Sequence, residues 1–356
     1  MTPEISLIVP VFKTKQYLRQ CLQSLVAQTL KNIEVILVCD GDDVEKNICL
    51  EFAQIYPNFT LIKGINKGLG GARNAGMKIA RGTYIGFVDS DDLIKEETYE
   101  VALNAIKSYD VDFVSWGAEI FCENELRNTK VVQETISYHT IKHTGLIKLN
   151  TNFILNTPVT VWNKLFKTSI IKNHQIEFPE NSRFEDNEFF YKYYAFSHSA
   201  YFLDKYLYKY RQRQNSLMQN LISNPDMYFD LLKVYSNVYN FYVQHKLLRK
   251  NKYLLSCLLT YVIDCYNKVN NQNLYREKLL HLLQKIDNGT LKNKYIGYVK
   301  RNKISSIIIQ QNIIKEHGNK LLGVSLKGNK LILKILYVKI AINLSPQITE
   351  YLNEIL

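Results

Sequence analysis

The sequence predicts an α/β fold in which a mixed, mainly parallel sheet is flanked by helices and followed by a helical C-terminal region. Over the first 116 residues, short β-branched runs alternate with amphipathic segments, and this order is typical of parallel strands joined by helices. Further along, apolar residues recur at helical spacing. We expect strands at Ile5–Val11, Ile33–Cys39, Thr60–Lys63, Tyr84–Asp89 and Asp112–Trp116, with helices at Lys15–Gln28, Asp43–Ile55, Gly70–Ala80, Lys95–Ser108, Met227–His245, Tyr253–Val269 and Leu274–Ile286.

The length of the chain predicts more than one structural unit. At 356 residues the chain exceeds what one compact core usually organises. Pro225 opens a helix readily and disfavours helix at Asn224, so we place a boundary there. This divides the chain into a domain over 1–222, with parts at about 1–116 and 117–222, and a basic region over 223–356.

Net charge and composition restrict the partners and the cellular location that the sequence predicts. The net charge of +12 comes from the tail, because residues 241–356 carry 19 Lys and Arg against 6 Asp and Glu. Such a tail suits nucleic acid, an anionic lipid surface, or neither. The amino terminus has no basic region before its apolar run, which predicts a cytoplasmic protein. Six scattered cysteines predict reduced thiols, and no apolar run is long enough to span a bilayer.

The acidic run Asp89, Asp91 and Asp92 is the most informative local feature. It follows a strand of buried type directly, in the segment GFVDSDD. Carboxylates this close repel one another unless a cation offsets them, and oxygen ligands suit Mg²⁺ or Mn²⁺. In the alternative, Asp92 caps a helix that begins near Leu93. Capping explains one aspartate of the three, so the pattern favours a metal site.

Two further turns lie at the same predicted sheet edge. Asp40, in the turn CDGDD, is placed to accept from a base or a ribose hydroxyl, although Asp-Gly is also an ordinary turn dipeptide. The glycines of Asn66–Gly76 allow close backbone approach before a helix, and Arg73 offers a forked donor to phosphate. This segment matches neither the dinucleotide-binding fingerprint nor a P-loop.

The second half of the domain supplies candidates for a base and for auxiliary contacts. Asp186, in the segment FED, is placed to take a proton from a hydroxyl, or else it is an exposed charge at a helix start. Trp162 suits stacking on a sugar ring, or it belongs to the core. Arg211 and Arg213 suit neutralising a diphosphate, or they lie on a solvated strand.

Taken together, the motifs IVPVF, a D-G turn, GxxxARNxG, VDSDD, WNKLF, FED and YRxRxNS resemble the inverting family 2 glycosyltransferases, which have the GT-A fold. The resemblance covers about residues 1–220. It implies transfer of a hexosyl or N-acetylhexosaminyl group from a nucleotide-diphosphate donor, expected to be a UDP-sugar, to a hydroxyl of a glycan or glycolipid. Enzymes of this kind often build bacterial capsule, lipopolysaccharide or lipo-oligosaccharide.

The resemblance also implies roles for individual residues. It implies that Asp89 and Asp91 bind the metal, Mn²⁺ or Mg²⁺, with Asp91 favoured as the direct ligand. It also implies that Asp186 is the general base, with Glu185 beside it. The residues implied to bind the nucleotide and donor are Pro10, Phe12, Asp40, Arg73, Asn74 and Asp89. In the domain over 1–222, donor binding is then expected in about 1–116 and the acceptor side in about 117–222.

The role of the tail and the catalytic status stay open. The tail suits a helix that rests on an anionic membrane surface, which would place the enzyme peripherally at the cytoplasmic face of the inner membrane. The apolar residues of this helix would be Ile332, Ile335, Leu336, Val338 and Ile340, interleaved with Lys330, Lys334 and Lys339. A helix packed on the catalytic domain is the alternative. A noncatalytic nucleotide- or carbohydrate-binding relative is the alternative to an enzyme. Nucleic acid is not expected as a partner, because the basic residues form no recognition motif.

Overall fold

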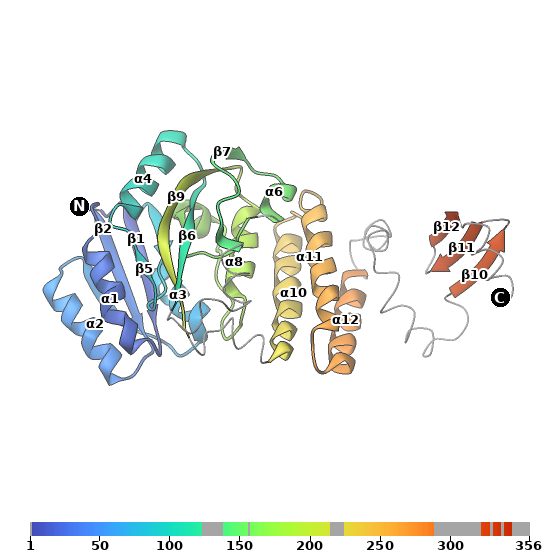
Figure 1. Ribbon diagram of the computed structural model, residues 1–356, viewed down its shortest axis with the longest axis horizontal. Coiled ribbons are helices and arrows are strands. Elements are labelled where there is room, and N and C mark those ends of the chain that lie inside the picture. Colours follow the sequence, from blue (N-terminus) through green and yellow to red (C-terminus); the bar gives the residue numbers. More distant parts are fainter. Residues whose placement is uncertain are drawn as a thin grey trace. The chain divides into compact units, whose positions relative to one another are not determined.

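The computed structural model describes residues 2–122, 138–155, 157–213, 224–287, 322–327, 330–335 and 338–343. The chain divides into two compact units, and Figure 1 labels their helices and strands. The first contains Met1–Leu254 and Cys265–Arg276, and the second contains Leu255–Asp264 and Glu277–Leu356.

A mixed sheet forms the centre of the first unit. Within the described ranges it has nine strands, in the order β3-β2-β1-β4-β8-β6-β9-β5, with β7 pairing β9 off this path. Strands β3, β2, β1 and β4 are mutually parallel, β8 runs antiparallel between β4 and β6, and β6 is parallel to β9. The strands are β1 (Ile5–Val11), β2 (Ile33–Cys39), β3 (Phe59–Lys63), β4 (Tyr84–Phe87), β5 (Leu93–Ile94), β6 (Phe113–Cys122), β7 (Gly145–Lys148), β8 (Lys164–Lys167) and β9 (Ser199–Gln212).

Helices cover both faces of this sheet. Alternate residues of β1 and β2 pack in one core with α1, α2 and α4. On the other face, α3 approaches β1 so closely that a Cβ at Gly76 would lie 2.5 Å from Ile8 Cγ2, and Phe189 of α8 stacks on Phe178. In the part of the chain that the structure describes, the helices are α1 (Lys15–Val26), α2 (Asp43–Ile55), α3 (Gly68–Ile79), α4 (Thr98–Tyr109), α6 (Thr151–Leu155), α7 (Thr168–Asn173), α8 (Glu185–Tyr194), η2 (Pro225–Tyr228), α10 (Phe229–Gln244), α11 (Lys252–Asp264), η3 (Cys265–Asn267) and α12 (Gln272–Asp287).

This arrangement confirms the predicted fold class. The expected strands at β1 and β2 and the expected helix at α2 agree with the structure to the residue. The helix expected from Lys95 begins at Thr98 instead, because Leu93 and Ile94 pair with β9 as the short strand β5. Local periodicity could not reveal a pairing partner more than 100 residues away.

The end of the chain departs from the helical prediction. Helices α10, α11 and α12 confirm it for residues 229–287, but β10 (Leu322–Lys327), β11 (Lys330–Ile335) and β12 (Val338–Asn343) form an antiparallel sheet. The expected membrane-surface helix over 330–340 is therefore wrong. Its isoleucines and Val338 are β-branched and favour strands, whereas their spacing alone had suggested a helix. The remaining predictions for 288–321 and 344–356 lie outside the described residues.

Two sequence-based exclusions can be compared with the described ranges. No helix there combines the length and apolar character needed to cross a bilayer. Among the described residues, Cys21, Cys39 and Cys49 are buried free thiols.

Candidate active site

The strand order brings the predicted site residues to one edge of the sheet. Strands β1, β2 and β4 run in the same direction, so the segments that follow them leave from the same edge. Strands β6 and β9 also end at this edge, and antiparallel β8 begins there. Ligands of α/β sheets bind at such carboxyl edges. The structure therefore gathers Phe12, Asp40, the acidic turn Asp89–Asp92 and Arg211–Arg213 along one side of the molecule.

A buried arginine forms the centre of the site. Arg73, on α3, is 1% exposed, and its guanidinium donates to Asp89 at 2.9 Å, Glu185 at 2.8 Å and Asp186 at 2.6 Å. Its Cζ also lies 5.2 Å from the ring centroid of Phe178. One cation thus joins the acidic turn after β4 to the start of α8. The sequence predicted that these residues share one site and that Arg73 binds a phosphate. In this structure the partners of Arg73 are carboxylates.

The backbone turns the two acids of α8 toward this arginine. Phe184 has a φ of 56°, in the left-handed region, and precedes Glu185 directly. A bulky residue seldom adopts this conformation, and such residues cluster at functional sites. Asp186 keeps one oxygen on Arg73, and its Oδ2 accepts from the amide of Val161 at 3.2 Å. The carboxylate expected to act as the base is thus held at both oxygens.

Burial changes the acidity of the carboxyls around Arg73. It raises the pKa of Glu185 to about 7, with the nearby charge of Asp186 acting in the same direction and Arg73 opposing. It also raises the pKa of Asp89 to about 6, against the lowering effect of Arg73. Glu185 and Asp89 therefore bind protons more readily than exposed acids would.

The raised pKa of Glu185 leads to a pH-dependent prediction. Between about pH 4.5 and 7 the folded chain holds a proton at Glu185 that the unfolded chain releases, so this group's contribution to stability falls as pH rises through that window. We expect Glu185→Gln to be increasingly favourable, relative to the wild type, as pH is raised from about 5 to 8. Thermal midpoints of both proteins across this range test it, and a difference independent of pH would contradict it.

The acidic turn after β4 does not cap a helix. Asp92 is fully buried and accepts from the Tyr208 hydroxyl at 2.8 Å and from the Arg211 amide at 2.7 Å. Its carboxyl therefore joins the turn to β9, and the capping alternative is wrong because Leu93 starts a strand. Burial raises the pKa of Asp92 well above its ordinary value, and the neighbouring Asp91 adds to the rise.

Asp91 and Asp89 are suitable ligands for a divalent cation. Their side chains are 21% and 22% exposed, and each accepts from one arginine, Asp91 from Arg213 at 2.7 Å and Asp89 from Arg73. Mg²⁺ and Mn²⁺ are commonly bound by one or two carboxylates together with substrate phosphates. Within the described ranges no cluster of three His, Cys, Asp or Glu side chains could hold a metal by itself. The donor set therefore fits an ion that takes its remaining ligands from water or from a bound phosphate group.

The residues expected to contact the nucleotide take several positions. Phe12 is 55% exposed, whereas Pro10 is buried in β1. Asp40 accepts from the Asn66 amide at 2.9 Å, so the turn after β2 is tied to the segment that leads into α3. Asn74 is 5% exposed and exchanges two hydrogen bonds of 2.9 Å with the Phe178 backbone, so it anchors that segment.

The auxiliary residues also differ in their surroundings. Trp162 is 4% exposed and stacks on Tyr208, with ring centroids 4.3 Å apart. Of the two predicted roles, packing in the core is therefore the one that the Trp162 ring has in this structure. Arg211 donates from Nε to the Asp91 carbonyl at 2.9 Å and supports the acidic turn, while the neighbouring Arg213 pairs with the Asp91 carboxylate.

Sequence reasoning missed several residues that shape this edge. The Tyr208 hydroxyl donates to Asp92, but nothing in the sequence distinguishes this tyrosine from the other tyrosines near it. Glu45 is 1% exposed, forms the capping box of α2 with Asp42 and accepts from the Thr14 amide. Lys164 is buried in a strand, and a lysine inside the apolar run Val161–Ile171 was a detectable signal.

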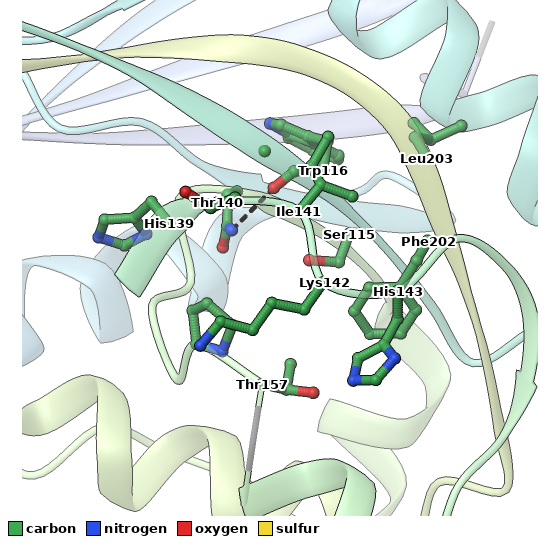
Figure 2. A pocket seen from close by; sticks show the side chains of 13 residues that line it. Ser115, Trp116, His139, Thr140, Ile141, Lys142, His143, Thr157, Phe202 and Leu203 are labelled. Atoms are coloured by element: carbon green, nitrogen blue, oxygen red, sulfur yellow. Dashed lines mark hydrogen bonds between the residues drawn. The ribbon is translucent and has the colours of Figure 1, made fainter. Parts of the chain in front are cut away.

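A small cavity lies beside this site and does not include the acids (Figure 2). Its volume is about 30 Å³, which is room for a water molecule and too little for a sugar ring. Among the described residues, the buried Trp116 Nε1 and His139 Nδ1 have no hydrogen-bond partner, and both residues line the cavity. Ordered water is therefore the occupant that fits it.

Comparison with known proteins agrees with this geometry. Residues 6–174 match the family described as Glycosyl transferase family 2. EpsH of Bacillus subtilis is 34% identical over 223 residues, covering 61% of this chain and 63% of EpsH. EpsJ of the same organism, an uncharacterised glycosyltransferase, is 32% identical over 251 residues, covering 68% of this chain and 70% of EpsJ. The chain thus spans less than two thirds of EpsH.

A solved structure shows the same fold. The structure of S. aureus TarS 1-349 in complex with UDP-GlcNAc matches with a TM-score of 0.53 and 18% identity, over 95% of this chain and 98% of that one. With the GT-A arrangement of strands and the family match in agreement, this chain belongs to the family 2 glycosyltransferases.

Proposed function

We propose that this chain transfers a sugar from a nucleotide-diphosphate donor to a hydroxyl of a glycan or glycolipid, with inversion at the anomeric carbon. A UDP-sugar that donates a hexosyl or N-acetylhexosaminyl group is the proposed donor, in keeping with the UDP-GlcNAc bound by the TarS structure. The proposed acceptors are bacterial surface glycans, the class that the motif resemblance implies. The observation that carries the proposal is the link from Asp89 through buried Arg73 to Asp186.

In the proposed reaction, Asp186 takes the proton of the acceptor hydroxyl as that oxygen attacks the anomeric carbon. The new bond from acceptor oxygen to carbon forms while the bond from that carbon to the diphosphate oxygen breaks, and the nucleoside diphosphate leaves with the electron pair. Arg73 and the Val161 amide orient the Asp186 carboxylate. Since both oxygens are held, the carboxylate is preorganised before the acceptor arrives.

Asp89 and Asp91 are the residues proposed to hold the cation. When bound, Mn²⁺ or Mg²⁺ would supply a Lewis acid that stabilises negative charge on the departing diphosphate. Arg213, which is 22% exposed and now pairs with Asp91, is the proposed cation for the same phosphates once Asp91 turns to the metal. Phe12 and Asp40 are proposed to contact the nucleoside from the neighbouring ends of β1 and β2.

The proposed division of labour follows the sheet. Residues 1–116 supply the donor side through the ends of β1, β2 and β4, and residues 117–222 supply Asp186 and the acceptor side. Residues 223–356 are proposed as a basic C-terminal region, whose helix α10 belongs to the first compact unit, with the enzyme peripheral at the cytoplasmic face of the inner membrane. Co-sedimentation with anionic vesicles, compared with neutral ones, tests that location.

Removing a metal ligand should separate donor binding from folding. We expect nucleotide sugar at 100-fold over its Kd, with Mn²⁺, to stabilise the wild type by about 2.7 kcal/mol, and Asp91→Asn to lose most of this gain. Thermal shift with UDP-glucose, UDP-galactose, UDP-GlcNAc and GDP-mannose measures it. Asp204→Asn, an exposed aspartate on β9, serves as the control. An undiminished Mn²⁺-dependent shift in Asp91→Asn would contradict the assignment.

A further inference from the structure

A lysine outside the acidic cluster is buried beside the proposed base. Lys164 begins β8 and is fully buried. Its Nζ donates to the carbonyls of Pro158 and Thr160, both at 2.7 Å, and to Asn163 Oδ1 at 2.9 Å. Each of the three N–H groups of the ammonium thus has a neutral oxygen as its acceptor. Among the described residues, no carboxylate forms an ion pair with this lysine.

This placement is costly for a side chain that only fills space. Burial lowers the pKa of Lys164 to about 7, and the nearby charge of Asp186 opposes that change. A buried charge without a direct ion-pair partner is seldom the most stable choice, and an apolar side chain of similar volume often does as well or better. The contacts of the ammonium therefore have to be explained by what they hold in place.

What they hold is the segment Pro158–Asn163, which leads into β8. Thr160 Oγ1 donates to Asn163 Oδ1 at 3.0 Å, and Asn163 Nδ2 donates to the Trp116 carbonyl of β6 at 2.9 Å, the bond drawn dashed in Figure 2. The ammonium thus joins both ends of the segment, and the segment is tied to the central sheet.

This same segment presents the amide that contacts the base. Val161 lies between the residues that Lys164 holds, and its N–H donates to Asp186 Oδ2 at 3.2 Å. The other Asp186 oxygen is held by Arg73. The direction in which this carboxylate points therefore depends on the conformation of Pro158–Asn163.

We propose that Lys164 is a positioning residue, which shapes the segment Pro158–Asn163 so that the Val161 amide aims the Asp186 carboxylate at the acceptor hydroxyl. The inference rests on the proposed function, because it assigns Asp186 as the base. A change at Lys164 should therefore slow proton removal without weakening donor binding, because the donor is proposed to contact another part of the sheet edge.

The test compares Lys164→Met with Lys167→Met. Lys167 lies on the same strand, and its Nζ pairs with Asp110 at the surface at 2.8 Å, so its variant should behave as the wild type. For Lys164→Met we expect release of nucleoside diphosphate, with Mn²⁺, the four nucleotide sugars named above and water as acceptor, to slow by roughly 10–100-fold. The donor Kd should stay within about twofold, because no donor-binding residue contacts Lys164.

A second readout follows the segment itself. Hydrogen exchange at the Val161 amide should be at least about tenfold faster in Lys164→Met, because the contacts that hold this amide on Asp186 have weakened. Asn163→Ala removes one acceptor of the ammonium and the tie to Trp116, and should show the same pattern more weakly. It also decides the question if Lys164→Met does not fold.

The outcomes separate this inference from the function on which it rests. A wild type that turns over none of the donors would contradict the proposed function. A wild type that is active, with Asp186→Asn inactive and Lys164→Met unimpaired, would overturn only the role of Lys164. Equal losses of rate and of donor affinity in Lys164→Met would also overturn it, since that pattern means general disruption of the site.

Discussion

Replacing Asp186 with asparagine is expected to reduce sugar transfer by roughly 10²–10⁴-fold, the range for loss of a general base, while the chain still folds and binds its donor. The amide is nearly the same size, and its single oxygen can still accept from Arg73, while its NH₂ group replaces the oxygen that accepted from the Val161 amide. It has no basic oxygen to take a proton. Turnover of a nucleotide sugar with Mn²⁺, measured beside the donor Kd, shows whether the rate falls alone.

The control for this variant is Asp204→Asn, which removes a carboxylate from an exposed position of β9. It should retain wild-type turnover. A fully active Asp186→Asn protein would remove this residue from the proton-transfer step. The remaining acid beside it, Glu185, would then be the group to examine.

Replacing Arg73 with methionine is expected to have the largest effect on stability. The variant leaves Asp89, Glu185 and Asp186 together without the cation that pairs with all three. Breaking a buried ion pair in this way costs about 3–5 kcal/mol, which corresponds to a fall in the thermal midpoint of roughly 6–20 °C. Transfer should also be lost, because the same guanidinium orients the base.

Three comparisons check the reason for this loss. Arg73→Lys should not restore stability, since one ammonium cannot reproduce a fork that reaches three carboxylates. Glu185→Gln in the Arg73→Met background should recover part of the loss by removing one unpaired acid. Arg19→Met removes an arginine with a 47% exposed side chain that pairs with Glu51, itself 44% exposed, and should leave the thermal midpoint almost unchanged, because exposed ion pairs contribute little to stability. Equal losses at positions 73 and 19 would contradict this explanation.

The predictable parts of this protein are those that local chemistry determines. Strands β1 and β2 could be located because apolar and β-branched residues run continuously between turn residues. Helix α2 could be located because an amphipathic segment begins directly after the turn CDGDD, although the capping box of Asp42 and Glu45 at its start was not recognised. The acidic turn could be recognised because its three carboxylates need compensation wherever they lie.

The parts that sequence reasoning missed depend on contacts between distant residues. Arg73 could be recognised as a forked donor, but its partners Glu185 and Asp186 lie 112 and 113 residues away, so its burial and its role in linking them could not be inferred. Asp92 was compared with a helix cap because its true partners, Tyr208 and the Arg211 amide, belong to β9. Such pairings follow from sheet order, which local periodicity does not encode.

The most direct measurement is a crystal structure of the wild type soaked with Mn²⁺ and UDP. The account predicts the ion on Asp91 and Asp89 with the diphosphate bound to it, and Asp91 moved off Arg213, from which it now accepts at 2.7 Å. A structure in which Asp91 stays on Arg213, while the nucleotide binds elsewhere or not at all, would contradict the account.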